Sequence, residues 1–131
     1  MENSYKSKHL EESCVSLPEI SNLVETLEKK VCKDFTVKSG GSNTTLLYSG
    51  KFSYNNGIDN ANIYLKILNN PDKSESPCSY NPLLGKSNDK NRKKIFIESS
   101  TEFESNKNTT KWNEIFSNFV KTVYDTVDEL K

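Results

Sequence analysis

The apolar residues near the N-terminal end of the chain recur at helical spacing. Five of them lie three or four positions apart, with charged residues between them: Ile20, Leu23, Val24, Leu27 and Val31. This spacing places them on one face of an amphipathic helix, which we predict over residues 16–31. Ser16 and Glu19 match a capping box, in which the two side chains satisfy backbone N–H groups at the helix start.

A longer stripe of the same kind lies at the C-terminal end. Its members are Trp112, Ile115, Phe116, Phe119, Val120, Val123, Val127 and Leu130. They predict a long helix that packs along one face, with Thr109 or Thr110 as its N-cap. At about 1.5 Å per residue, such a helix is long enough to cross a whole small sheet.

Between the two helical stretches the apolar period changes to two, which indicates strands. Residues 35–37 predict a short strand, and residues 93–98 predict the last one. Residues 44–54 and 61–68 flank Asn55-Asn56-Gly57, a strong turn signal, and therefore predict an antiparallel hairpin. Tyr80 to Lys86 forms either a short strand or a tight turn. The sequence thus predicts an α+β fold, an antiparallel sheet of about three to five strands flanked by an N-terminal helix and a long C-terminal helix.

Length and composition favour one domain with some mobile segments. The chain has 131 residues, of which 33% are hydrophobic. This is the size of a single domain, but the apolar share is low for a globular protein. We therefore expect residues 1–14 to be mobile and residues 69–81 and 99–108 to form flexible loops, because polar residues dominate there.

The cysteines and the N-terminus predict a cytoplasmic protein. Cys14, Cys32 and Cys78 are odd in number and far apart, so we expect no disulfide framework. The first residues lack the apolar core of a signal peptide, and no apolar run is long enough to cross a membrane. We therefore expect a reducing compartment and no membrane insertion.

The sequence offers little for catalysis. His9 is the only histidine, and it lies in the segment expected to be mobile. No cysteine or histidine cluster has zinc spacing, and no nucleophile motif is present. Ser39-Gly-Gly-Ser42 resembles a phosphate loop but lacks the lysine of that motif, and we interpret it as a turn. We expect no enzyme activity, cofactor, metal or small-molecule substrate.

A basic segment is the clearest candidate for a binding site. Lys86, Lys90, Arg92, Lys93 and Lys94 are accompanied by a single carboxylate, Asp89, although the formal net charge of the chain is zero. A basic loop between two strands concentrates positive potential and is able to neutralise phosphates. The alternative is a solubilising loop in a lysine-rich protein.

The sheet also predicts a second candidate surface. Leu47, Tyr64 and Leu68 fall opposite the main core-facing positions of the hairpin. If both helices cover one face of the sheet, these side chains remain on the other face as a partner interface. The alternative is that loops or the N-terminal segment cover them.

Three segments resemble the small Alu-domain subunit family of the signal recognition particle. Pro82-Leu-Leu-Gly-Lys86 is similar to an apolar strand of that family that ends in a basic residue. The lysine-rich loop before Ile95-Phe-Ile97 is similar to its basic loop and last strand, and residues 112–121 resemble the start of its C-terminal helix. The resemblance implies a ribonucleoprotein subunit that binds structured RNA as a heterodimer with a like-folded partner. It also implies that the five basic residues from Lys86 to Lys94 contact phosphates.

Two other classes remain open. Pro82-Leu-Leu-Gly85 after a hairpin is also similar to small proteasome assembly chaperones, in which residues 44–50 and 61–67 would be paired strands. Those proteins place a helix before the next strand, and residues 86–94 leave no room for it. A helix-flanked adaptor domain, of the kind found in kinetochore and ubiquitin-pathway scaffolds, is the third class. Both of these would be protein-only interaction modules.

Overall fold

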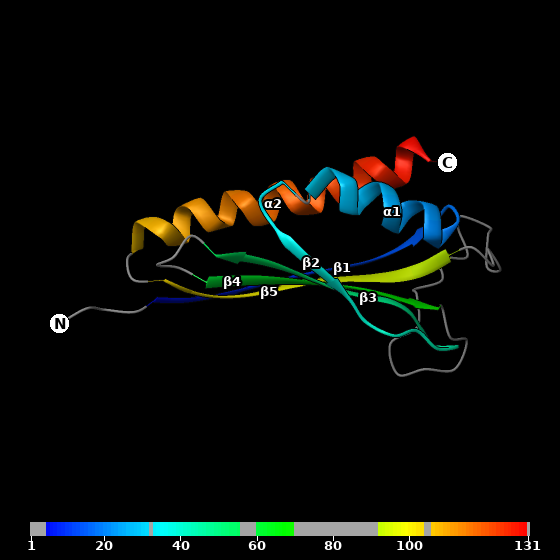
Figure 1. Ribbon diagram of the computed structural model, residues 1–131, viewed down its shortest axis with the longest axis horizontal. Helices are drawn as coiled ribbons and strands as arrows, with labels where there is room; N and C mark the ends of the chain where they lie inside the picture. The colour runs from blue at the N-terminus through cyan, green and yellow to red at the C-terminus, as the bar shows by residue number, and fades with distance from the viewer. Residues whose placement is uncertain (1–4, 32, 56–59, 70–91, 104–105, 131) are drawn as a thin grey trace, which may run out of the picture.

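Two helices pack on one face of a five-stranded antiparallel sheet in the computed structural model of the chain (Figure 1). The structure describes residues 5–31, 33–55, 60–69, 92–103 and 106–130. Along the chain the elements are β1 (Tyr5–Ser16), α1 (Ile20–Val31), β2 (Thr36–Ser39), β3 (Leu46–Asn55), β4 (Asn60–Asn69), β5 (Arg92–Phe103) and α2 (Asn106–Glu129). The strand order in the sheet is β1-β5-β4-β3-β2. The α+β class, the antiparallel sheet and its two flanking helices are confirmed.

Buried and more exposed side chains alternate along the strands, as expected for a sheet with one buried face. In β4, Ile63, Leu65 and Ile67 are buried, whereas the residues between them are half-buried or exposed. β5 repeats the pattern with Ile95 and Ile97. A period of two places these side chains on one face of the sheet, and the helices cover that face.

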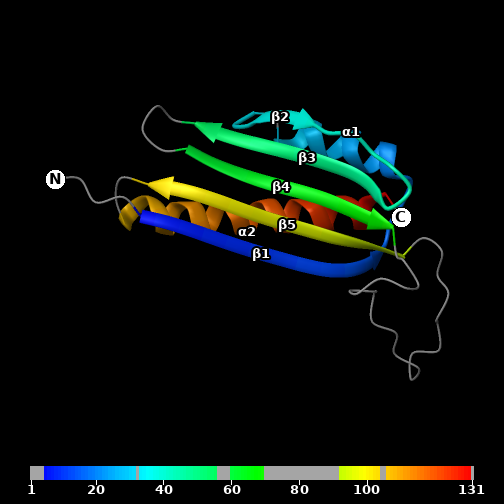
Figure 2. The same ribbon diagram turned by 90° about the horizontal axis from the view of Figure 1, so that it is seen from below.

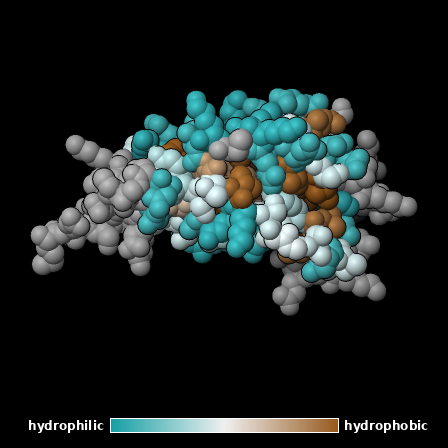
Figure 3. Space-filling view, in the orientation of Figure 1, coloured by the Kyte–Doolittle hydropathy of each residue, from teal (hydrophilic) through white to brown (hydrophobic). Residues whose placement is uncertain are grey.

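The apolar stripe of α2 forms the other half of the core. Trp112, Phe116, Phe119, Val123 and Val127 are buried. The Phe119 ring meets Phe52 of β3 edge to face, with 4.9 Å between the ring centroids. Figure 3 shows hydrophilic residues along the outer side of the helices and hydrophobic residues in the band between helices and sheet. The predicted stripe is therefore confirmed, although α2 begins at Asn106, before the predicted caps.

Strand β1 was not predicted. Residues expected to be mobile pair with β5 along the whole strand, from Tyr5 opposite Phe103 to Ser16 opposite Arg92. Polar side chains connect β1 to α2: His9 stacks on Phe116 with 5.0 Å between the ring centroids. The expected loop at 99–108 is likewise replaced by the end of β5 and the start of α2. β1 is held mainly by backbone hydrogen bonds to β5. Its side chains therefore need not alternate between apolar and polar, and the sequence gives no strand pattern there.

The predicted start of the first helix was wrong. Ser16 is the last residue of β1, and α1 begins at Ile20. Leu23 donates its backbone N–H to the carbonyl of Glu19 at 3.1 Å, which makes Glu19 the capping residue. The apolar stripe was predicted correctly, since Leu23 and Leu27 are buried. The capping box fails because Ser16 is engaged in strand pairing.

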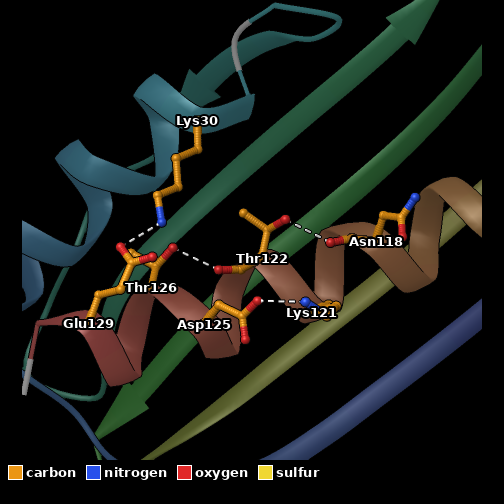
Figure 4. Close-up of polar contacts among 7 residues, drawn as sticks. All are labelled: Lys30, Asn118, Lys121, Thr122, Asp125, Thr126 and Glu129. Atoms are coloured by element: carbon orange, nitrogen blue, oxygen red, sulfur yellow. Dashed lines mark hydrogen bonds and ion pairs between the residues drawn. The ribbon is translucent and has the colours of Figure 1, made fainter.

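Polar contacts join and shape the helices at their C-terminal ends (Figure 4). Lys30 of α1 donates to Glu129 of α2 at 2.7 Å. Within α2, the fully buried Thr126 donates its hydroxyl to the carbonyl of Thr122 at 2.7 Å. This bond satisfies the buried hydroxyl without a partner from the sheet, as threonine often does inside a helix.

Tyr48 and Gly50 form a tight contact under α1. They lie two positions apart on β3 and therefore on the same face, and the Tyr48 hydroxyl donates to Glu28 of α1 at 3.3 Å. A Cβ atom added at Gly50 would clash with the Tyr48 hydroxyl oxygen and would lie 2.7 Å from the ring carbon that carries this hydroxyl. Gly50 therefore allows the buried ring to lie along the strand and reach the helix.

Replacement of this glycine is expected to destabilise the fold. Gly50→Ala forces the Tyr48 ring away from α1, and overpacking of this kind costs about 1–3 kcal/mol of unfolding free energy. Gly41→Ala is the matched control, because a Cβ there meets no atom within 4 Å. Urea denaturation followed by circular dichroism measures both variants. Equal stability of the two would contradict this account of Gly50.

Two tyrosines connect the helices to the sheet and have raised pKa values. Burial is the main cause for both Tyr48 and Tyr124, and the carboxylates of Glu28 and Glu11 add to it. Hydrogen bonds with Ser39 and Ser13, respectively, act in the opposite direction. The folded protein therefore keeps these hydroxyl protons at a pH where the unfolded chain has begun to lose them.

Alkaline pH should weaken the fold through these two groups. A raised pKa stabilises the folded state fully below the unfolded value of about 10, and the contribution is lost as pH rises through the folded pKa. The unfolding free energy should therefore fall above pH 10. The double variant Tyr48→Phe, Tyr124→Phe should show a shallower fall in urea titrations across this range. An identical pH profile in the variant would refute the assignment.

Candidate binding face of the sheet

The face of the sheet opposite the helices, called the open face below, is not covered by any other described element (Figure 2). Strand registers identify its side chains, because directly paired residues point to the same side. The residues on it include Lys8, Leu10, Glu12 and Cys14 of β1, Thr36 and Lys38 of β2, Leu46, Ser49, Lys51 and Ser53 of β3, Asn62, Tyr64, Lys66 and Leu68 of β4, and Lys94, Phe96, Glu98 and Ser100 of β5.

The half of the open face on β2, β3 and β4 is basic. Lys38 lies directly opposite Lys51, which lies opposite Tyr64, and Lys66 follows two residues later on β4. All three lysines are exposed. Among the described residues none of the three forms an ion pair. We call Lys38, Lys51 and Lys66 the lysine cluster.

Two aromatic rings border the lysine cluster. Phe96 is directly opposite Lys66, and Tyr64 is diagonal to Phe96 across β4 and β5. The Lys51 amine lies 6.0 Å from the centre of the Tyr64 ring, at the outer limit of a cation–π contact. Both rings are half-buried, so each presents part of its surface on the open face.

The half of the open face on β1 and β5 neutralises its own charges. Lys8 pairs with Glu98 at 3.0 Å, and Lys94 pairs with Glu12 at 2.5 Å. Lys94 is only 5% exposed, and its amine lies 5.0 Å from the centre of the Phe96 ring. The carboxylate of Glu12 therefore compensates a buried cation, and Glu98 compensates Lys8 at the surface.

The predicted basic loop is only partly described. Lys86 and Lys90 lie outside the described residues, and Arg92 is the first residue of β5. Lys93 donates to the side chain of Asn69 at 2.9 Å, and Lys94 is buried in its pair with Glu12. A phosphate would have to displace these partners to reach either lysine, so the described part of the segment is less accessible than the lysine cluster.

The predicted interface residues fall on two different sides. Tyr64 and Leu68 lie on the open face, as expected. The position expected for Leu47 is corrected: it is half-buried and packs against the core. The cause is a register shift between Leu46 and Tyr48, where one extra residue enters β3 and changes the alternation.

The lysine cluster was not predicted as a site from the sequence. The signal was present in the period of two: Lys51 stands between Gly50 and Phe52, and Lys66 stands between Leu65 and Ile67. A lysine between two core-facing positions of a strand must lie on the other face. Single lysines spaced along separate strands give a weaker charge signal in the sequence than the contiguous basic run near Lys94.

The described residues do not gather metal-binding side chains at one place. They contain no group of three or more His, Cys, Asp or Glu side chains able to hold a metal ion. A shallow depression of about 420 Å³ follows the outer side of α2, lined by Thr110, Asn113, Glu114, Ser117 and Asn118. Within the same described ranges, no helix is both long and apolar enough to span a bilayer.

Cys14 corrects the expectation of reduced cysteines. It is disulfide-bonded, and the other cysteines of the chain, Cys32 and Cys78, lie outside the described residues. Cys14 lies on the open face opposite Lys94. A disulfide persists under oxidising conditions, and the expected cytoplasmic location stays a prediction.

Comparison with known proteins gives no assignment. Neither a protein-family model nor a curated protein matches the sequence. The binding face described above therefore provides the basis for a functional proposal.

The disulfide gives a direct prediction. Proteolysis without reduction, followed by mass spectrometry, should yield a peptide containing Cys14 covalently linked to one containing Cys32 or Cys78. Reduction should release both peptides and raise the number of free thiols per chain from one to three. Alkylation of all three cysteines in the unreduced, denatured protein would contradict the disulfide.

Proposed function

We propose that this protein is a non-catalytic RNA-binding subunit of a ribonucleoprotein that contacts RNA phosphates through its open face. The observation that carries the proposal is the lysine cluster, in which three exposed lysines occupy neighbouring strands without an ion-pair partner among the described residues. Phosphate contacts of this kind dominate the affinity of nucleic-acid-binding proteins.

The arrangement of the cluster favours an anionic ligand. Lys38 and Lys51 are directly opposite each other, and like charges in this position destabilise a strand pair. A phosphate between the two amines would remove that repulsion. The repulsion between the two lysines therefore destabilises the free protein but not the complex, and this difference in free energy favours binding.

The two aromatic rings extend the same surface. Tyr64 and Phe96 lie beside the lysines, where unpaired bases of a structured RNA can stack on them. Each base stacked on an aromatic side chain contributes about 1–3 kcal/mol and tolerates any sequence. The combination fits recognition of RNA by phosphates and stacking, with little readout of base identity.

The resemblance to the Alu-domain subunit family agrees with this proposal in its general features. It implies structured RNA as the ligand and a like-folded protein as the partner. The proposed contacts nevertheless differ from the sequence-based expectation, because they centre on the lysine cluster and include the segment from Lys86 to Lys94 only as a neighbouring region.

Charge removal in the lysine cluster should weaken RNA binding and its dependence on salt. The triple variant Lys38→Gln, Lys51→Gln, Lys66→Gln removes up to three phosphate contacts. The slope of log affinity against log salt should become shallower by about 2, at roughly 0.7 per contact for single-stranded segments. Fluorescence anisotropy with a labelled hairpin RNA that contains an unpaired loop measures this slope.

The control removes the same charge from the helix side. Lys29, Lys111 and Lys121 are exposed residues of α1 and α2, and their replacement by glutamine should leave the slope near that of the unmodified protein. The RNA proposal fails if the unmodified protein shows no salt-dependent binding. It also fails if both triple variants change the slope equally.

A protein-only interaction module is the second candidate. Leu46 and Leu68 are directly paired at one end of the open face, and Phe96 lies nearby. These apolar groups would suit a protein partner such as the substrate of an assembly chaperone or the target of an adaptor. A complex that persists after ribonuclease treatment and is lost with Leu68→Asp would favour this candidate over RNA.

A further inference from the structure

Strand β1 forms one edge of the sheet. It pairs with β5 on one side, and no described strand pairs with its other side. Figure 2 shows β1 at the rim, beyond β5 and with its full length along the edge. An edge strand of this length offers a row of backbone N–H and C=O groups to any strand that can pair with it.

The charges of β1 are arranged symmetrically about Leu10. Lys8 and His9 precede it, and Glu11 and Glu12 follow it, so that each basic residue has an acidic counterpart at the same distance. Leu10 is 60% exposed and is the only large apolar side chain exposed to this degree in the described ranges. The Lys8 and Glu12 side chains are 72% and 41% exposed.

We propose that β1 is a self-association edge, on which a second copy of this chain pairs antiparallel about a two-fold axis at Leu10. In this register Leu10 faces Leu10 of the second copy, and Lys8 faces Glu12 of the second copy. His9 faces Glu11 in the same way on the helix side of the sheet. One strand thus supplies a central apolar contact and opposite charges on both sides of it, as an isologous interface requires.

The neighbouring registers are less favourable. A two-fold axis perpendicular to the sheet requires directly opposed residues to lie on the same face. The axis therefore always passes beside a residue that faces its own counterpart, and the nearest alternative axes lie at Glu11 and His9. An axis at Glu11 places Glu11 against Glu11, and one at His9 places His9 against His9. Two opposed carboxylates destabilise a strand pair, and the axis at His9 opposes Lys8 to Leu10, whereas the axis at Leu10 opposes Lys8 to Glu12.

The existing ion pairs are compatible with the second copy. Lys8 is paired with Glu98, and Glu12 with Lys94, through one carboxylate oxygen each. A lysine amine has three donors and a carboxylate accepts several hydrogen bonds, so each pair extends into a four-residue network across the interface. The two five-stranded sheets then form one continuous sheet of ten strands with both open faces on the same side.

The oligomeric state of three proteins tests the interface. Sedimentation equilibrium over a concentration series should show the unmodified chain, of 14.9 kDa, associating into a species of twice that mass. Leu10→Asp places two carboxylates at the axis and should raise the dissociation constant more than about tenfold. Thr36→Asp introduces a carboxylate on the opposite edge strand, β2, and should leave the dissociation constant unchanged. Circular dichroism checks that both variants are folded.

Crosslinking tests the register. Under mild oxidation Leu10→Cys should form a disulfide-linked dimer, because the two new thiols face each other. Lys8→Cys is the control: its two copies are offset by four residues, about 14 Å along the strands, which exceeds disulfide reach. The proposal is overturned if the unmodified chain stays monomeric throughout, if Leu10→Asp associates normally, or if both cysteine variants crosslink equally. These outcomes leave RNA binding by the lysine cluster unaffected.

Discussion

The packing of α2 against the sheet determines which side of every strand is buried. Its stripe from Trp112 to Val127 meets β3 through Phe52 and β1 through His9, so one helix contacts strands at both sides of the sheet. Because the core is densely packed, a strand cannot turn its buried side chains to the other face without loss of the core. Once α2 is placed, Lys51, Lys66 and Tyr64 have no position other than the open face.

This constraint also explains the division of the open face. Near β1 and β5, where Lys94 is buried, the sheet supplies Glu12 as a counter-charge, because an unpaired buried ammonium group is costly. On β2, β3 and β4 the lysines are exposed, and water compensates their charges. The same type of residue is therefore a structural partner on one half and a candidate ligand contact on the other.

The sequence predicted the elements whose apolar side chains build the core. The stripe of α2, the hairpin of β3 and β4 and the stripe of α1 follow from periodicity, since burial imposes the period. β1 could not be found in this way, because His9 stacks on Phe116, Ser13 hydrogen-bonds Tyr124, and backbone pairing holds the strand. The side of Leu47 depends on a bulge, and a bulge leaves no signature in an apolar pattern. The lysine cluster consists of residues distant in sequence, and only the strand registers bring Lys38 next to Lys51.

The central claim is that RNA binds on the open face, and nuclear magnetic resonance can map the contact directly. Addition of a short RNA with an unpaired loop to isotope-labelled protein should shift the backbone amide signals of Lys51, Tyr64, Lys66 and Phe96. The signals of α1 and of the outer side of α2, including Lys29 and Asn113, should remain in place. Shifts confined to the helices, or none at saturating RNA, would contradict the account.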